Sequence, residues 1–287
     1  MSRAHSLSHN PVGRIAVGHP GLVKVGRAGW FAKGVVYVVA GLLALLVAAQ
    51  ATGWSRAAST GGQEASPTGA LKTIAQMSGG KLLMWVLAGG MLLYAGWRVV
   101  SASLPGGSDV KAWVTRIGYL VSAVIYTTFA LTAVALARVT LATPDGNAKV
   151  SSLSDRIMTH SGGRLVIGLV GAIAIGAGMY RIVKGVRQDV SDELDLSGWS
   201  VQRRAWTRRI GAIGEFGRGM GIGLIGFFLV RAAVTYDSSQ ATGLDGALRR
   251  LAVQDWGLVV VTVIGLGFGA YGLFCLVTFT RRELQAP

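Results

Sequence analysis

Three charged side chains lie within long apolar stretches of this chain, and they are its strongest candidates for chemistry. Lys33, Glu215 and Arg218 each stand just inside the start of such a stretch. Glu215 precedes Arg218 by three residues, so a helix would place both on one face, where they can form an ion pair. Because charge is costly in a hydrocarbon environment, each of these residues is a functional hypothesis.

Two interpretations of Lys33 and Arg218 are open. In the first, both side chains extend back to the lipid head groups, as long basic side chains do near helix ends. In the second, they join Ser122, which holds the related position of an internal repeat, in a polar ring on the cytoplasmic side. Such a ring, with Glu215 beside Arg218, would line a central cavity or hold the head group of an anionic lipid.

The remaining residues give no pattern of a catalytic, cofactor or metal site. His5 and His9 belong to a polar tail, and the single cysteine, Cys275, lies in an apolar run, where it is expected to pack as a small hydrophobic side chain. No acidic residue stands near the middle of an apolar stretch, which weighs against a proton- or sodium-coupled transporter. We therefore predict no catalytic residue, no cofactor and no metal, and a protein that is not an enzyme.

Glycines recur at four-residue spacing inside the apolar stretches. The sets are Gly217 with Gly221, Gly219 with Gly223, Gly265 with Gly269, and Gly168 with Ala172 and Gly176. Small residues at this spacing let helices approach closely in a membrane. A phosphate loop would instead need a following Lys-Ser/Thr and a preceding strand, which these sets lack.

The composition places these residues in a membrane protein. Of the 287 residues, 51% are hydrophobic and only 14% are charged, against about 25% in soluble domains. The net charge of +15 would also fit a nucleic-acid binder, but the charges fall between the apolar stretches, as in the loops of a membrane protein. Nucleic acid is therefore not an expected partner.

Six stretches are long enough to cross a bilayer as helices, which takes about 20 apolar residues. They run approximately over Trp30–Gln50, Leu82–Ser103, Trp113–Ala137, Leu165–Gly185, Ile210–Ala233 and Trp256–Thr280. No apolar segment of a signal peptide precedes Trp30, so the first span is expected to act as an uncleaved signal. The side that holds both termini carries 18 of the 28 Lys and Arg residues, which predicts cytoplasmic termini in the cell membrane.

An internal repeat relates three helix pairs. Three sets of residues align: Gly29, Gly118 and Gly214; then Lys33, Ser122 and Arg218; then Tyr37 and Tyr126. Later in each unit, Ser78–Lys81 matches Ser161–Arg164 and Asp255–Gly257, Tyr94 matches Tyr271, and Trp97-Arg98 matches Tyr180-Arg181. The three units have one orientation, so they are parallel repeats, and a pseudo-threefold axis along the membrane normal is expected.

The repeat resembles a known family, the bacterial membrane proteins called domain of unknown function 1206 (DUF1206). The resemblance covers about residues 24–282 and rests on Arg27-Ala28-Gly29, on Lys33-Gly34-Val35-Val36-Tyr37 and on Gly-Ala-Leu turns at 69–71 and 246–248. The third copy departs from the pattern, since Ile222 replaces the tyrosine. The resemblance implies six helices in three repeats and no particular activity.

The chain is accordingly divided into a tail (1–23), repeat 1 (24–104), repeat 2 (113–187), a cytoplasmic linker (188–208) and repeat 3 (209–282). Short amphipathic segments are expected in the external loops, one from Leu71 and Ile74 and one from Leu244, Leu248 and Leu251. The basic half of the linker, with Arg203, Arg204, Arg208 and Arg209, is expected to contact anionic lipid.

Three function classes follow from these patterns, the third being a lipid-processing enzyme, for which the sequence offers no candidate acid or base. The first is a non-enzymatic scaffold or accessory subunit of the cell membrane, with membrane lipids and a membrane-protein partner or a second copy as its partners. The second is a small transporter or pore with a path along the pseudo-threefold axis.

Overall fold

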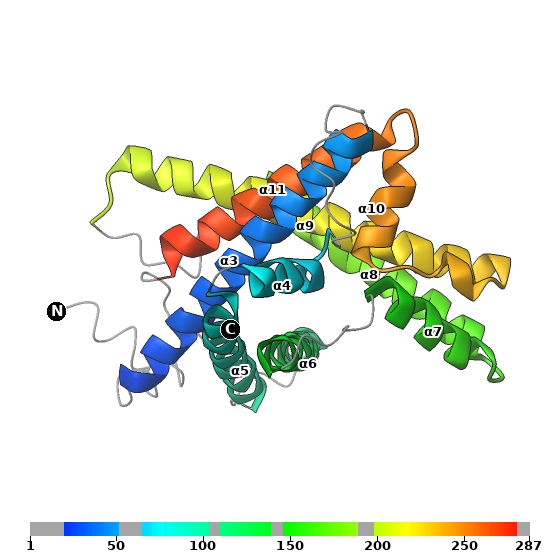
Figure 1. Ribbon diagram of the computed structural model, residues 1–287, viewed down its shortest axis with the longest axis horizontal. Coiled ribbons are helices and arrows are strands. Elements are labelled where there is room, and N and C mark those ends of the chain that lie inside the picture. The colour runs from blue at the N-terminus through cyan, green and yellow to red at the C-terminus, as the bar shows by residue number, and fades with distance from the viewer. Residues whose placement is uncertain are drawn as a thin grey trace.

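The structure is a computed structural model that describes residues 20–51, 65–77, 79–103, 110–138, 146–188 and 198–279. Every regular element in these ranges is helical (Figure 1). The long helices are α3 (Pro20–Ala51), α5 (Gly80–Ser103), α6 (Val110–Arg138), α8 (Gly163–Val186), α9 (Val201–Thr235) and α11 (Gly257–Thr278). The short ones are α4 (Pro67–Gln76), α7 (Gly146–Met158), the 3-10 turn η1 (Ser238–Gln240) and α10 (Leu244–Ala252).

Within the described ranges, six helices are long and apolar enough to cross a membrane, with mean hydropathies of 1.4 to 2.2 over their most apolar parts. The prediction of six spans in an all-α membrane protein is confirmed. α9 has 35 residues and begins at Val201, so residues 201–208 of the predicted linker are helical. The tail up to residue 19 and linker residues 189–197 lie outside the described ranges.

The long helices pack most extensively in three pairs, α5 with α6, α8 with α9, and α3 with α11. Each pair joins the second helix of one repeat to the first helix of the next, and α11 returns from repeat 3 to repeat 1. Figure 1 shows α3 and α11 running side by side along a diagonal, whereas α6 is seen nearly end-on. The three pairs therefore run in different directions.

Further contacts join the two helices of a repeat. α3 packs on α5 in repeat 1, and α9 packs on α11 in repeat 3. In the described part of the chain, α6 and α8 of repeat 2 do not pack along each other in this way. The expected arrangement of six helices around one axis is therefore open between α6 and α8.

Small residues at related positions form the three main pairs. A Cβ on Gly219 of α9 would lie 2.6 Å from the carbonyl oxygen of Gly178 in α8, and one on Gly226 would lie 2.7 Å from that of Gly171. The α3–α11 pair repeats this contact, since a Cβ on Gly34 would lie 3.0 Å from the Gly272 carbonyl oxygen. In the α5–α6 pair, buried alanines take the related positions: Ala88, Ala95, Ala123 and Ala130.

Two of the predicted four-residue glycine sets lie at these helix contacts. A Cβ on Gly178 would lie 2.6 Å from the carbonyl oxygen of Gly219 and 2.8 Å from the backbone nitrogen of Gly223. One on Gly41 would lie 2.8 Å from the carbonyl oxygen of Gly265 and 2.5 Å from the backbone nitrogen of Gly269. Gly176 departs from the prediction, since a Cβ there would meet nothing within 4 Å, and the α8–α9 contact recurs after seven residues, at Gly171 and Gly178. Seven residues return nearly to the same side of a helix, and this spacing keeps the contact between two long, closely packed helices.

A glycine also stands at the start of the second long helix of each repeat. A Cβ on Gly80, Gly163 or Gly257 would lie 2.1, 1.7 or 1.6 Å from the carbonyl oxygen six residues earlier, of Ile74, Ile157 or Leu251 respectively. The chain thus turns from each short helix into the following long one with backbone against backbone. This common turn supports the predicted alignment of the three repeats.

The short helices α4 and α10 both pack against α3, and each also contacts the long helix that follows it. Leu71 and Ile74 of α4 are buried, as are the leucines of α10, which confirms the amphipathic segments predicted there. The Asp245 carboxylate of α10 accepts a hydrogen bond of 2.7 Å from the backbone N–H of Ala65, which links repeat 3 to repeat 1. α7 is the corresponding short helix of repeat 2, and it buries its apolar side less completely, since Leu153 remains exposed.

Candidate functional site

The side chain of Lys33 lies where the three repeats meet. Only 5% of the residue is exposed. Its ammonium nitrogen lies 4.4 Å from the ring centre of Trp30 and 5.2 to 5.3 Å from those of Tyr94, Tyr126 and Tyr271. These rings come from α3, α5, α6 and α11, so one cation contacts aromatic faces of all three repeats. A cation held by aromatic rings away from water is stabilised by about 2 kcal/mol or more.

The rings around Lys33 also contact one another. Tyr94 and Tyr126 have ring centres 4.6 Å apart, and Trp30 lies 5.7 Å from Tyr94, both in edge-to-face geometry. Tyr37 packs edge-to-face on Tyr271 at 4.9 Å. Such pairs contribute about 0.5–1.5 kcal/mol each beyond the area they bury. The aromatic groups therefore fix the helices of different repeats to one another.

Arg218 is the second buried cation. Its guanidinium lies 3.9 Å from the ring centre of Tyr271 and 5.2 Å from that of Tyr37, and it donates a hydrogen bond of 3.0 Å to Glu215. The other oxygen of Glu215 accepts a bond of 2.8 Å from Arg181 of α8. Within the described residues, Nε of Arg218 is buried without a hydrogen-bond partner.

The cation–aromatic cluster is defined here as Lys33, Arg181, Glu215 and Arg218 with the rings of Trp30, Tyr37, Tyr94, Tyr126 and Tyr271. Three cations and one carboxylate leave an excess of two positive charges. Arg98 extends it toward the end of α5, since Nε donates to the Tyr94 hydroxyl at 2.8 Å and the guanidinium lies over Tyr119. Aromatic faces, rather than further carboxylates, surround most of this charge.

The structure brings together three of the four candidate residues. Lys33 and Arg218 share the ring of Tyr271, and Glu215 pairs with Arg218 as the three-residue spacing predicts. Ser122 is outside the cluster: it is partly exposed, and its hydroxyl donates to the Gly118 carbonyl of its own helix at 2.9 Å. The expected extension of Lys33 and Arg218 to the lipid surface is wrong, because both are buried. A lipid contact at these residues stays a prediction.

Sequence reasoning missed the aromatic half of the cluster and Arg181. The signal was present in the repeat, because Tyr94 and Tyr271 align, as do Arg98 and Arg181. What the alignment could not give is the direction of these side chains, which depends on how the pairs cross. The basic residues at the start of α9 form local contacts of the same kind, such as Arg203 over Trp199 at 4.1 Å.

The chemistry open to this cluster is binding and positioning. Its titratable groups are cations, phenols and one carboxylate held between two arginines, an arrangement that offers no activated nucleophile. Within the described residues, no three His, Cys, Asp or Glu side chains lie close enough together to hold a metal ion. The excess positive charge would attract an anion.

Repeat 2 differs from the other two where its own helices should meet. A Cβ on Gly29 would lie 2.6 Å from Cβ of Tyr94, and one on Gly214 would lie 2.8 Å from Cβ of Tyr271, each within its repeat. The related glycine of α6, Gly118, has nothing within 4 Å, and Ala177 of α8 replaces the tyrosine. We call this opening the α6–α8 seam.

Side-chain size explains the seam. One turn further along the same helix faces, Gly217 of α9 lies against Gly267 of α11 in repeat 3, where a Cβ added to Gly217 would lie 2.5 Å from the Cα of Gly267. The related residues of repeat 1, Ala32 and Gly90, are buried. Repeat 2 has Val121 and Ile173 at the related positions. These side chains are 52% and 62% exposed. They are too large for the close contact made in the other repeats.

Comparison with known proteins gives a family and one relative. The model of the family described as "Domain of Unknown Function (DUF1206)" matches residues 28–104, 117–188 and 213–279, one segment for each repeat, and the chain belongs to this family. It is also 31% identical over 261 residues to "Uncharacterized protein YxxB" of Bacillus subtilis (strain 168), with 90% of each chain covered. No solved structure matches the chain.

Proposed function

We propose that this DUF1206 protein is a non-enzymatic scaffold or accessory subunit of the cell membrane that receives a helix of a partner membrane protein in the α6–α8 seam. The observation that carries the proposal is the difference between the repeats. Repeats 1 and 3 bury the faces that join their two helices, whereas repeat 2 leaves Val121 and Ile173 exposed.

The cation–aromatic cluster supports this role because it fixes the edges of the seam. Tyr126 of α6 contacts Tyr94 of α5 at 4.6 Å, and Arg181 of α8 pairs with Glu215 of α9. Each helix that borders the seam is thus tied to the body of the molecule by a buried group. A preformed opening lowers the ordering cost of binding a partner helix.

Membrane helices associate through shape and small residues, since lipid gives no hydrophobic drive between them. The seam offers both small residues and shape. Gly118 and Ala177 let the backbone of a partner helix approach, and Val121 and Ile173 project as contacts on either side of it. A partner helix would replace the contact that repeats 1 and 3 make internally.

Site-specific photo-crosslinking in native membranes tests the proposal. A photoreactive residue at Val121 or Ile173 should give one discrete adduct with a second protein. Matched positions on other exposed faces, Leu92 of α5 and Leu266 of α11, should not. Adducts with lipid only from all four positions would refute the proposal, and an adduct with a second copy of this chain would replace it by homo-oligomerisation.

The orientation is part of the same proposal, with both termini in the cytoplasm. The bias of Lys and Arg toward the side of the termini supports it. A reporter fused after Pro287 that is active only when exported should therefore be silent, and an active reporter would reverse the topology.

A second candidate function is an anion transporter, favoured by the excess positive charge of the cluster and the unpartnered Nε of Arg218. Against it, an apolar core that includes Tyr94, Tyr126 and Tyr271 packs between α3, α5, α6 and α11. Proteoliposomes should show no chloride or phosphate flux above that of empty vesicles. Flux that is lost with Arg218→Met would favour the transporter.

A further inference from the structure

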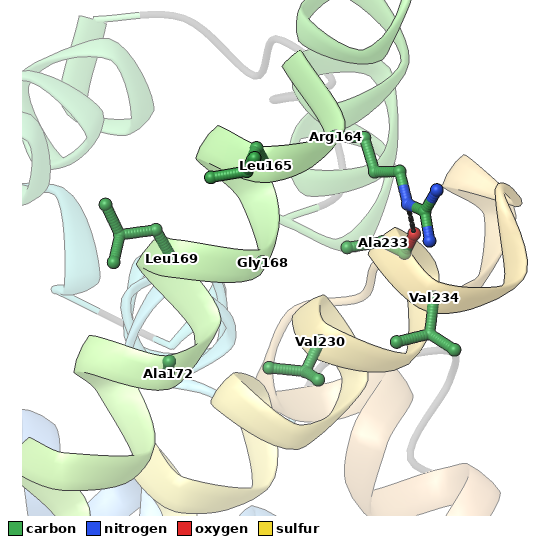
Figure 2. Close-up of a pocket in the computed structure, with 8 residues that line it drawn as sticks. All are labelled: Arg164, Leu165, Gly168, Leu169, Ala172, Val230, Ala233 and Val234. Atoms are coloured by element: carbon green, nitrogen blue, oxygen red, sulfur yellow. Dashed lines mark hydrogen bonds between the residues drawn. The ribbon is translucent and has the colours of Figure 1, made fainter. Parts of the chain in front are cut away.

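An apolar groove opens between the first turns of α8 and the last turns of α9. It has a volume of about 500 Å³. Figure 2 shows its lining, with Gly168 and Ala172 on α8, Val230 and Val234 on α9, and Arg164 at one end. Leu165, Leu169 and Ala233 complete it. Apart from Arg164, every lining residue is apolar or a glycine.

The repeat shows that the related α5–α6 pair has large side chains where the α8–α9 pair has this groove. In the related α5–α6 pair, Trp85 takes the position of Gly168 and Arg138 takes that of Val234. The Arg138 guanidinium lies 5.7 Å from the Trp85 ring centre. In the pair that forms the groove, the absence of a side chain at Gly168 leaves the corresponding space empty. Here a Cβ would meet only that of Ala233, at 3.5 Å.

Arg164 is held at the end of the groove in a fixed position. Its Nε donates to the carbonyl oxygen of Ala233 at 2.7 Å, and its guanidinium bonds the Tyr236 hydroxyl and lies 3.8 Å from that ring. The residue is exposed, and no carboxylate in the described part of the chain lies within ion-pair distance of it. An oriented guanidinium with an open face is well suited to a phosphate group.

The surroundings of the groove identify its occupant. Its floor lies within two membrane-spanning helices, and Arg164 stands in the first turn of α8, where the hydrocarbon gives way to head groups. We infer that the groove binds an anionic phospholipid, with an acyl chain over Gly168 and Ala172 and the phosphate at Arg164. The volume lies in the usual range of ligand pockets, about 300–1,000 Å³. This site is separate from the α6–α8 seam and does not depend on the function proposed for it.

The test measures which lipids stay with the purified full-length protein. After reconstitution with equal amounts of phosphatidylglycerol and phosphatidylcholine, native mass spectrometry should find phosphatidylglycerol bound in preference. Arg164→Gln should reduce that preference about fivefold, the effect of losing about 1 kcal/mol for one basic residue near the surface. Gly168→Trp, which copies Trp85 of repeat 1, should abolish retention of either lipid.

Gly176→Trp is the matched control, because it adds the same ring to an open position of α8. It should retain lipid as the unchanged protein does. Gel filtration in detergent identifies any variant that fails to fold. If Gly168→Trp does not fold, Gly168→Leu fills the groove with a smaller side chain for the same measurement. Equal retention of the two lipids, or unchanged retention in both Gly168 variants, would overturn the inference.

Discussion

Removing the Arg218 side chain should destabilise the protein strongly, because it leaves Glu215 in the membrane with one cation instead of two. Nitrogen and oxygen of the Glu215–Arg218 pair are 3.0 Å apart, and the two side chains are only 11% and 8% exposed. Loss of one partner of a buried pair costs about 3–5 kcal/mol. Arg181 still bonds Glu215 at 2.8 Å, so Arg218→Met should fall near the lower limit, about 3 kcal/mol.

The opposite change gives a larger effect. Glu215→Gln removes the only carboxylate of the cluster and leaves Arg218 buried with two other cations, Lys33 and Arg181, so it should cost about 5 kcal/mol. The double variant removes one charge of each sign. It should therefore be less destabilised than the sum of the single variants, by about 1–3 kcal/mol.

Unfolding of detergent-solubilised protein in increasing SDS, followed by tryptophan fluorescence, measures these differences. Arg209→Met is the control, since it makes the same substitution at an exposed position of α9. It should change the free energy of unfolding by less than about 1 kcal/mol. Additive single effects, or an Arg218→Met variant as stable as the control, would refute the reasoning.

Three further predictions concern the architecture. Alanine at Gly80, Gly163 or Gly257 should lower the thermal stability, because the new Cβ would lie 1.6–2.1 Å from a carbonyl oxygen. In the same assay Gly89→Ala should raise the thermal stability slightly, because Gly89 has open space around it and alanine favours the helix. Gly178→Val should separate α8 from α9 and give an aggregated or unfolded species in detergent gel filtration, while Gly176→Val should elute as the unchanged protein does. Tyr94→Phe should cost about 1–2 kcal/mol in SDS unfolding, because Arg98 loses the hydroxyl to which it donates, and no loss would show that this bond is dispensable.

Much of the architecture could be predicted from the sequence because local properties determine it. The apolar length of each span requires no knowledge of the fold. The leucine spacing of α10 and the glycines at 80, 163 and 257 likewise act within a few residues of chain. The predicted register agrees with the three matched segments, which begin at Ala28, Ile117 and Ile213, one residue before each aligned glycine.

The helix pairing could not be predicted because it depends on contacts between distant residues. Glycines at four- and seven-residue spacing are both abundant in this chain, and only packing shows that Gly171 and Gly178 touch α9. One interpretation of the repeat placed Lys33, Ser122 and Arg218 in one polar ring. Ser122 instead donates to the Gly118 carbonyl of its own helix and stays outside the cluster.

The candidate site lay between these extremes. Buried charge marked Lys33, Glu215 and Arg218 correctly as unusual residues. Their aromatic surroundings became visible only when Tyr94, Tyr126 and Tyr271 of three repeats met around one ammonium group.

The open α6–α8 seam is the claim on which the proposed function depends, and disulfide trapping in native membranes tests it most directly. In a Cys275→Ala background, the pair Ala95→Cys and Ala123→Cys should oxidise readily, because these residues lie in the closely packed α5–α6 pair. The pair Val121→Cys and Ile173→Cys should remain reduced under the same conditions. Efficient formation of a disulfide between positions 121 and 173 would show that α6 and α8 close on each other and would contradict the account.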